Sequence, residues 1–250
     1  MIFGFNIQLF VTVLLFPFIY SLIIFFTSPY KSVSYKRGLL FLLAGIFSTE
    51  VVHLIYFFIP YLGESHSDFF TYFGIVGPVE EVSKFIMFYG MMSLTKDKKV
   101  SEHPFKYMFY FGMTGLGFAL LENIHYIMYY GEEILLPRSF TSTIAHMIFG
   151  LLFGYYIGLG SITRKSFENR SIFGVLVRKN KKIKKFIYFL TGYLLASYYH
   201  GMYNYNLATS DESAGIILMI LLAFGLIICK LLADDLNRKW SLREKKSKID

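Results

Sequence analysis

The chain has 250 residues, of which 55% are hydrophobic and 20% are aromatic, and its mean hydropathy is +0.49. This composition excludes an ordinary soluble domain and is typical of a polytopic membrane protein. The single cysteine, Cys229, excludes an intramolecular disulfide and a cysteine zinc site. The net charge of +8 does not indicate nucleic-acid binding, because the basic residues follow the pattern of membrane topology.

Seven apolar stretches follow one another along the chain, each about 20 residues long and therefore able to cross about 30 Å of hydrocarbon. We expect an all-α fold, a polytopic transmembrane helix bundle with about seven spans. The sequence predicts a single transmembrane domain over residues 1–232 and a basic cytoplasmic tail over 233–250. The predicted spans cover about residues 3–26, 38–59, 69–94, 105–130, 140–162, 186–207 and 214–232.

Lysine and arginine are distributed unequally between the two sides of this predicted bundle. The loops after the first, third and fifth spans, together with the tail and Lys230 just before it, hold 23 of the 25 basic residues. Arg138 alone lies in a loop on the opposite side, and Lys84 lies within a span. The positive-inside rule then places the amino terminus outside and the carboxyl terminus in the cytoplasm of a plasma-membrane protein. We expect the basic runs also to contact anionic lipid at the cytoplasmic face.

The third span contains Glu80, Glu81 and Lys84 near its middle. Charges at this depth are costly, so they usually face a protein interior or a wet cavity and carry a function. On a helix, Lys84 is four residues from Glu80 and three from Glu81, so it can neutralise one carboxylate and leave the other for chemistry. The alternative is a buried structural ion pair, for which one glutamate would suffice.

Polar residues at helical spacing recur in the neighbouring spans, and several lie at a similar depth, from mid-membrane toward the outer face. The fifth span carries a stripe of His146 and glycines four residues apart, which would let two helix backbones approach closely. We expect His146 to face a neighbouring helix rather than lipid. The other polar positions are Glu50 and His53 in the second span, Glu122, Asn123, His125 and Tyr126 in the fourth, and His200 and Asn204 in the sixth.

Two glutamates, two histidines and an asparagine suit the activation of water. A buried glutamate can act as a general base, and histidine and asparagine can donate hydrogen bonds to a developing oxyanion. Alternatively, Glu81, His146 and His200 could bind one divalent metal, with Zn²⁺ the expected ion, and leave a position open for water. Both alternatives predict hydrolysis at membrane depth.

These residues resemble the successive motifs of PrsW-type intramembrane proteases, which belong to a wider superfamily with CAAX prenyl endopeptidases. The resemblance covers about residues 74–206 and implies a catalytic core at about 69–207. Prenyl endopeptidases typically have an arginine five residues after the first glutamate, where this chain has Phe85, and a histidine where it has Glu122. The cation here is Lys84, so the resemblance is to the PrsW branch. The motifs are Glu80-Glu81-x-x-Lys84, Gly117-Phe118-Ala119-x-x-Glu122-Asn123-x-x-Tyr126, His146 with its glycine stripe, and His200-x-x-x-Asn204.

The resemblance implies an endopeptidase that cuts a single-pass, membrane-anchored protein, such as an anti-sigma factor, on the extracytoplasmic side. Glu80 and Glu81 would hold the catalytic water, one of them acting as base, and His200 and Asn204 would polarise the scissile carbonyl. His146 and Glu122 would complete the polar cluster, with Lys84, Asn123 and Tyr126 in support.

Three other functions stay open on the sequence alone. A catalytically inactive scaffold could keep the fold, although it would not need charges at that depth. A proton or ion transporter could use the buried glutamates as a relay, and a di-metal oxidase could use the Glu50–His53 and Glu122–His125 pairs. We expect Glu50 and His53 to form a supporting polar pair or a pore-facing patch, and His66 and His103 to be solvated in loops.

Overall fold

Helices are the only regular elements in the described parts of the chain, which confirms the predicted all-α class. The structure is a computed structural model that describes residues 7–28, 33–59, 66–95, 103–162, 181–209 and 214–247. Its elements, in chain order, are α1 (Ile7–Phe26), α2 (Tyr35–Phe58), the π-helix η2 (Phe70–Val76), α3 (Gly77–Leu94), α4 (Phe105–Tyr130), the 3₁₀ turn η3 (Glu132–Ile134), α5 (Leu135–Ile162), α7 (Lys181–Thr209) and α8 (Ala214–Ser247).

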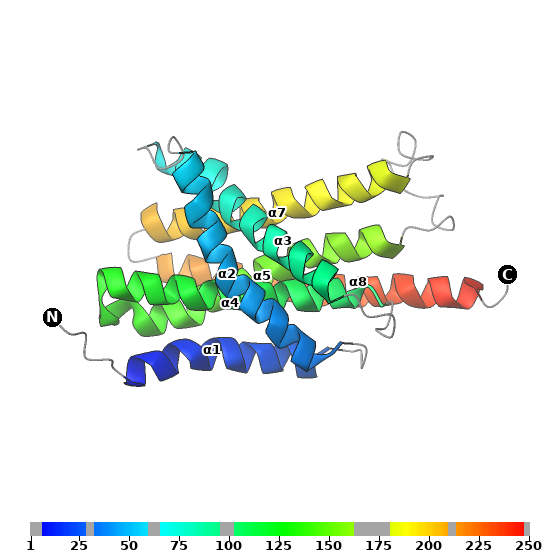
Figure 1. Cartoon of the computed structure of the whole chain (residues 1–250), viewed down its shortest axis with the longest axis horizontal. Helices are drawn as coiled ribbons and strands as arrows, with labels where there is room; N and C mark the ends of the chain where they lie inside the picture. The colour runs from blue at the N-terminus through cyan, green and yellow to red at the C-terminus, as the bar shows by residue number, and fades with distance from the viewer. Residues whose placement is uncertain are drawn as a thin grey trace.

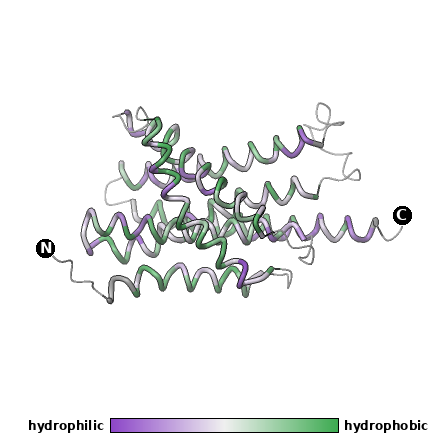
Figure 2. The backbone as a smooth tube through the Cα atoms, in the orientation of Figure 1, coloured by the Kyte–Doolittle hydropathy of each residue, from purple (hydrophilic) through white to green (hydrophobic). Residues whose placement is uncertain are grey.

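The helices run back and forth along one axis, and α2 and α3 cross the others obliquely (Figure 1). α1 begins at one end of the bundle, and α8 finishes at the opposite end. The start of α7 and the end of α8 lie at the same end of the bundle, and both contain hydrophilic residues (Figure 2). The basic residues of these two segments include Lys182, Lys184, Lys185, Arg238, Lys239 and Arg243.

Three helices in the described part of the chain are long and apolar enough to cross a membrane. They cover Tyr35–Phe58, Glu132–Ile162 and Gly215–Lys245, and Val11–Phe26 is a shorter apolar helix. The remaining helices are less apolar; α3, for example, carries three charged residues within 18. A helical membrane bundle is thus supported, while the number of seven spans and their orientation stay predictions.

Glycines bring the backbones of α2, α4 and α5 into direct contact. A Cβ atom placed on Gly117 would lie 1.8 Å from the carbonyl oxygen of Leu42, and one on Gly115 would lie 2.1 Å from that of His146. A Cβ on Gly150, in the predicted glycine stripe, would lie 2.4 Å from the carbonyl oxygen of a residue on α4. No other residue fits these positions without separating the helices. The prediction that the stripe packs against a neighbouring helix is confirmed.

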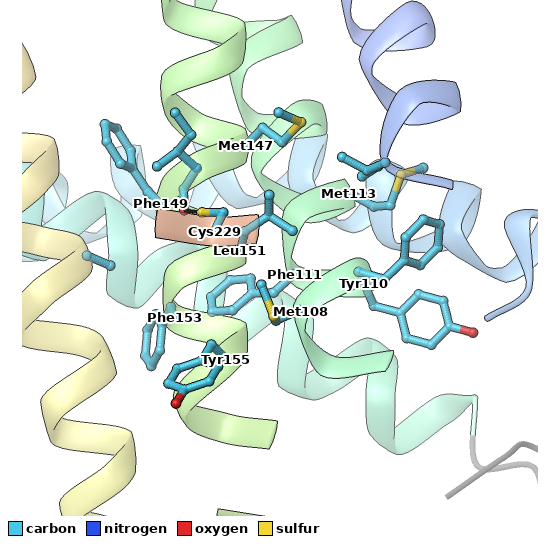
Figure 3. Packing of buried hydrophobic residues seen from close by; sticks show 14 of the residues in the cluster. Met108, Tyr110, Phe111, Met113, Met147, Phe149, Leu151, Phe153, Tyr155 and Cys229 are labelled. Atoms are coloured by element: carbon cyan, nitrogen blue, oxygen red, sulfur yellow. Dashed lines mark hydrogen bonds between the residues drawn. The ribbon is translucent and has the colours of Figure 1, made fainter. Parts of the chain in front are cut away.

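The apolar core lies between α4, α5, α7 and α8 and is rich in aromatic and sulfur-containing side chains (Figure 3). Phe111, Phe149 and Phe153 are fully buried there, and Cys229 of α8 lies beside the carbonyl oxygen of Ile148. Phe149 also stacks on the ring of a histidine in α7, His200, with 4.6 Å between the ring centroids. The core therefore supports one wall of the polar cluster described below.

Two predictions about loops are wrong. Arg138 was expected in an outer loop, but α5 begins at Leu135, so Arg138 lies on its first turn and is mostly buried. His103 was expected to be solvated, but it is buried, and its ring packs edge-on against Trp240 of α8. This contact exists because α8 continues as a helix past Leu232 to Ser247.

Most of the predicted basic loops lie outside the described residues. The basic segments outside the described residues are 29–32, 96–102 and 163–180. The acidic residues at 64 and 211–212, in the predicted loops of the opposite side, also lie outside them.

Candidate active site

The polar residues predicted on four separate spans come together in one buried cluster. α3 supplies Glu80 and Glu81, α4 supplies Glu122, α5 supplies His146 and α7 supplies His200. α3 begins directly after η2, has Pro78 at its start, and carries Glu80 in its first turn with Glu81 next to it. The hydroxyl of Tyr193 on α7 donates to the carbonyl oxygen of Pro78 at 3.2 Å, which ties this turn to the helix that carries His200.

Lys84 lies at the centre of the cluster and is completely buried. Its ammonium nitrogen is 2.7 Å from Oε1 of Glu81, 2.9 Å from Nδ1 of His146 and 3.9 Å from Oε2 of Glu80. It also lies 4.1 Å from the centroid of the Phe118 ring, a geometry that adds a cation–π attraction. Lys84 therefore neutralises Glu81 more directly than Glu80. Of the two pairings that the sequence allowed, the one with Glu81 is the closer.

Glu122 joins the cluster to Arg138, a residue that the sequence reasoning missed. Oε2 of Glu122 is 3.0 Å from Nε2 of His146 and accepts a 2.7 Å hydrogen bond from Nη2 of Arg138. The guanidinium of Arg138 covers the face of the Tyr126 ring at 3.3 Å from its centroid. The signal was present in the sequence, since Arg138, Ser142 and His146 recur at intervals of four and share one helix face.

His200 connects the two adjacent glutamates. Its Nδ1 is 3.0 Å from Oε1 of Glu81, and its Nε2 is 3.5 Å from Oε2 of Glu80. The rings of His200 and His146 are perpendicular, with 5.0 Å between their centroids. His200 therefore presents one nitrogen to a fixed carboxylate and the other to Glu80.

Oε2 of Glu80 and Nε2 of His200 are buried and, within the described residues, make no hydrogen bond. Buried polar atoms are normally paired, so two such atoms facing one another are a candidate position for a ligand or a water molecule. The cluster holds three carboxylates, of Glu80, Glu81 and Glu122, and two cations, of Lys84 and Arg138. The uncompensated carboxylate is that of Glu80, which fits a general base or a cation ligand.

The remaining predicted residues lie at the edge of the cluster or away from it. Asn123 is buried, and its Nδ2 donates to Oγ1 of Thr143 at 3.2 Å, which links α4 to α5. Tyr126 supports Arg138, as described above. Asn204 is one turn beyond His200 and partly exposed, and its side chain makes no hydrogen bond to the described residues.

Glu50 and His53 lie outside the cluster. Their carboxylate and ring nitrogen are 3.6 Å apart, and 59% of each side chain is exposed. The His53 ring lies 5.6 Å from that of His125, which is also exposed. Because Glu122 points into the cluster while His125 points away from it, the two pairs do not form the site that a di-metal oxidase would need.

One group of side chains in the described residues fits a metal ion: Glu80, His146 and His200, each of which offers a ligand atom within 4.8 Å of the others. One carboxylate and two imidazoles are a known donor set for catalytic zinc. The sequence proposed Glu81 in this role, but Glu81 is not part of this group. Its Oε1 is engaged by Lys84 and His200, and only its Oε2 has no hydrogen bond within the described residues. Glu81 instead faces Nδ1 of His200 and orients the ring, as a carboxylate behind a metal-binding histidine does. Glu80 and His200 offer unpaired donor atoms, whereas both nitrogens of His146 are within hydrogen-bonding distance of other side chains.

The fold and the cluster define a helical membrane protein with a buried glutamate–histidine site. Residues 37–229, which include every helix that contributes to the cluster, match the family described as PrsW family intramembrane metalloprotease. The chain belongs to this family.

Curated relatives agree with this assignment. A protein named Protease PrsW from Shouchella clausii is 33% identical over 100 residues, which are 40% of this chain and 38% of the relative. Proteins of the same name from Geobacillus kaustophilus and Bacillus subtilis are 23% identical over 131 residues and 31% identical over 105. Those matches cover 52% and 40% of this chain and 50% and 47% of the relatives, so the chain spans about half the length of these relatives or less. No solved structure matches the chain.

Proposed function

We propose that the protein is an intramembrane endopeptidase that hydrolyses a peptide bond of a membrane-anchored protein. The observation that carries this proposal is the pair of unpaired, buried atoms, Oε2 of Glu80 and Nε2 of His200, 3.5 Å apart. Membership of a family of membrane proteases supports it, as does the position of the pair within the matched residues.

In the proposed mechanism, Glu80 is the general base. A water molecule that lies to one side of this pair donates one hydrogen to Oε2 of Glu80 and the other to Nε2 of His200. As the water oxygen bonds to the carbonyl carbon, Glu80 takes its proton and then delivers it to the leaving amine nitrogen while the C–N bond breaks. In the alternative with a divalent metal, Glu80 and His200 would hold the ion in place of these contacts to the water, and the ion would supply Lewis-acid polarisation of the carbonyl and a more acidic water.

The other residues hold this pair in place. Glu81 fixes the orientation of His200 through Nδ1, and Lys84 fixes Glu81. Asn204, whose amide has no partner among the described residues, is proposed to donate to the carbonyl oxygen as negative charge develops on it. The resemblance to the PrsW family assigned polarisation of the carbonyl to His200 as well as to Asn204, but the geometry favours a role for His200 in holding the water.

We propose the predicted topology for the membrane setting: seven spans in the plasma membrane, the amino terminus outside and the carboxyl terminus in the cytoplasm. The gathering of basic residues at the end of the bundle where α8 finishes supports this orientation. Glu122 lies two turns before the end of α4, and His146 lies three turns after the start of α5, both toward the opposite end. Cleavage on the extracytoplasmic side of a single-pass substrate, such as an anti-sigma factor, is proposed on this basis, with anionic lipid at the cytoplasmic face.

Substitution of Glu80 by Gln tests the proposal. The matched control is Glu50→Gln, which makes the same chemical change on an exposed side chain outside the cluster. The purified full-length variants would be reconstituted with a panel of tagged single-pass membrane proteins, and cleavage would be followed by immunoblot. We expect E80Q to lose at least about 10²-fold in rate, as removal of a general base does, and E50Q to retain wild-type rates. Wild-type rates for E80Q, or binding without cleavage by the wild-type protein, would contradict the proposal.

A further inference from the structure

Lys84 occupies a position that resembles that of a bound cation. Its ammonium is contacted by a carboxylate oxygen of Glu81 at 2.7 Å and by Nδ1 of His146 at 2.9 Å, and it faces the Phe118 ring. These groups come from three helices, α3, α4 and α5, and the lysine side chain is entirely buried among them. The cluster therefore already contains a cation that the chain itself supplies.

This arrangement fixes the protonation of the His146 ring. An ammonium group has donors and no acceptor, so Nδ1 of His146 must offer its lone pair to Lys84. The other nitrogen, Nε2, then carries the hydrogen and donates it to Oε2 of Glu122 at 3.0 Å. Arg138 holds the same carboxylate oxygen from the other side. Both nitrogens of His146 are thus engaged, and neither has a lone pair free for a metal.

His200 is arranged in the opposite way. Its Nδ1 faces the carboxylate of Glu81, an acceptor, so the hydrogen of the neutral ring lies on Nδ1 and the lone pair lies on Nε2. That lone pair points toward Glu80 and is unpaired within the described residues. Two histidines that look equivalent in the sequence therefore have different capacities to bind a metal.

We propose that Lys84 occupies the lone pair on Nδ1 of His146 that a metal ion would otherwise use, so that His146 is a positioning residue and not a metal ligand. A divalent ion at this site is held by Glu80 and His200, and it can recruit His146 only when Lys84 is displaced. The inference shares its site with the proposed peptidase function, but it concerns metal binding, which can be measured without a substrate. A failure here would leave the E80Q cleavage test unaffected.

Binding of Co²⁺ and Zn²⁺ to full-length protein in detergent tests the proposal, by the visible absorption of Co²⁺ and by calorimetry. We expect H146Q to bind with the wild-type affinity within about twofold. K84M should bind at least about tenfold more tightly, because His146 becomes available, and K84M/H146Q should lose this gain. K230M is the matched control, since Lys230 pairs with Asp234 on an exposed face of α8, and its affinity should be unchanged.

Three results would overturn the proposal: a tenfold or greater loss of affinity in H146Q, no gain in K84M, or no binding to either wild-type protein or K84M. If K84M does not fold, the wild-type protein still gives an answer through ¹⁵N NMR of its histidines, with His146 assigned from the signal missing in H146Q. We expect His146 to carry its hydrogen on Nε2 and to keep its shifts when Zn²⁺ is added, while the Nε2 signal of His200 moves. A metal-bound shift at either nitrogen of His146 would refute the inference.

Discussion

Substitution of Gly115 by Ala should disable the active site without touching any of its polar residues. Gly115 lies on α4, two turns before Glu122, and packs against the backbone of α5 at His146. A Cβ atom at this position would lie 2.1 Å from the carbonyl oxygen and 2.8 Å from the carbonyl carbon of His146. These atoms belong to the backbone of a packed helix, so no side chain can move aside to make room.

The size of the effect follows from the distances. An ordinary contact of a Cβ atom begins at 3.4 Å, so α4 and α5 would have to separate locally by about 1.3 Å. A shift of this size takes the 3.0 Å contact between Nε2 of His146 and Oε2 of Glu122 beyond hydrogen-bonding range. Overpacking of this kind costs about 1–3 kcal/mol in stability, and a misplacement of about 1 Å in an active site can cost about 10²-fold in rate.

The assay compares thermal unfolding in detergent and cleavage in proteoliposomes for G115A and G90A. Gly90 lies on α3, and a Cβ atom there would meet nothing within 4 Å. We expect G115A to melt at a lower temperature and to lose at least about 10²-fold in cleavage rate. G90A should keep its activity and gain up to about 1 kcal/mol, since alanine favours a helix over glycine. If G115A matched the wild type, or if both variants failed equally, the account of the α4–α5 contact would be refuted.

Three further predictions follow from the contacts around the cluster, from a contact between α5 and α8, and from the proposed orientation in the membrane. R138Q should lose cleavage activity by at least about tenfold because it removes a charged partner of Glu122. R238Q, which changes a largely exposed arginine, is the control and should keep its activity. Equal cleavage rates for the two variants would exclude a role for Arg138. Y155F should lower the free energy of unfolding by about 1 kcal/mol in thermal or denaturant unfolding, because it removes a 2.7 Å hydrogen bond between α5 and α8. Y89F, at an exposed tyrosine, is its control and should have no effect. A reporter fused after the last residue should be active in the cytoplasm, and an extracytoplasmic signal would reverse the proposed orientation.

The all-helical class, the family and the identity of the polar cluster could be predicted from the sequence because each rests on a local pattern. A hydropathic run of about 20 residues specifies a helix wherever it packs, and glycines four residues apart specify a close contact whichever helix provides it. The spacing of His146 and its glycines therefore predicted a buried histidine, and the structure buries it against α4. The same logic found Glu80 and Lys84 because charges within an apolar run cannot face lipid cheaply.

The sequence by itself indicated most of the residues that the structure buries together, whereas only the tertiary structure decided which other residue joins them and which atom of each has no partner. Helical spacing allows Lys84 to reach either Glu80 or Glu81, but the packing of α3 against α7 brings Lys84 and His200 into hydrogen-bonding distance of Oε1 of Glu81. Oε2 of Glu80 has no hydrogen bond within the described residues. His146 and His200 likewise differ only in which partner each nitrogen meets. Arg138 entered the cluster because α5 begins a turn earlier than its hydropathy indicates. Hydrogen bonds between helices depend on rotation and depth to within about an ångström, and no pattern within a single helix contains that information.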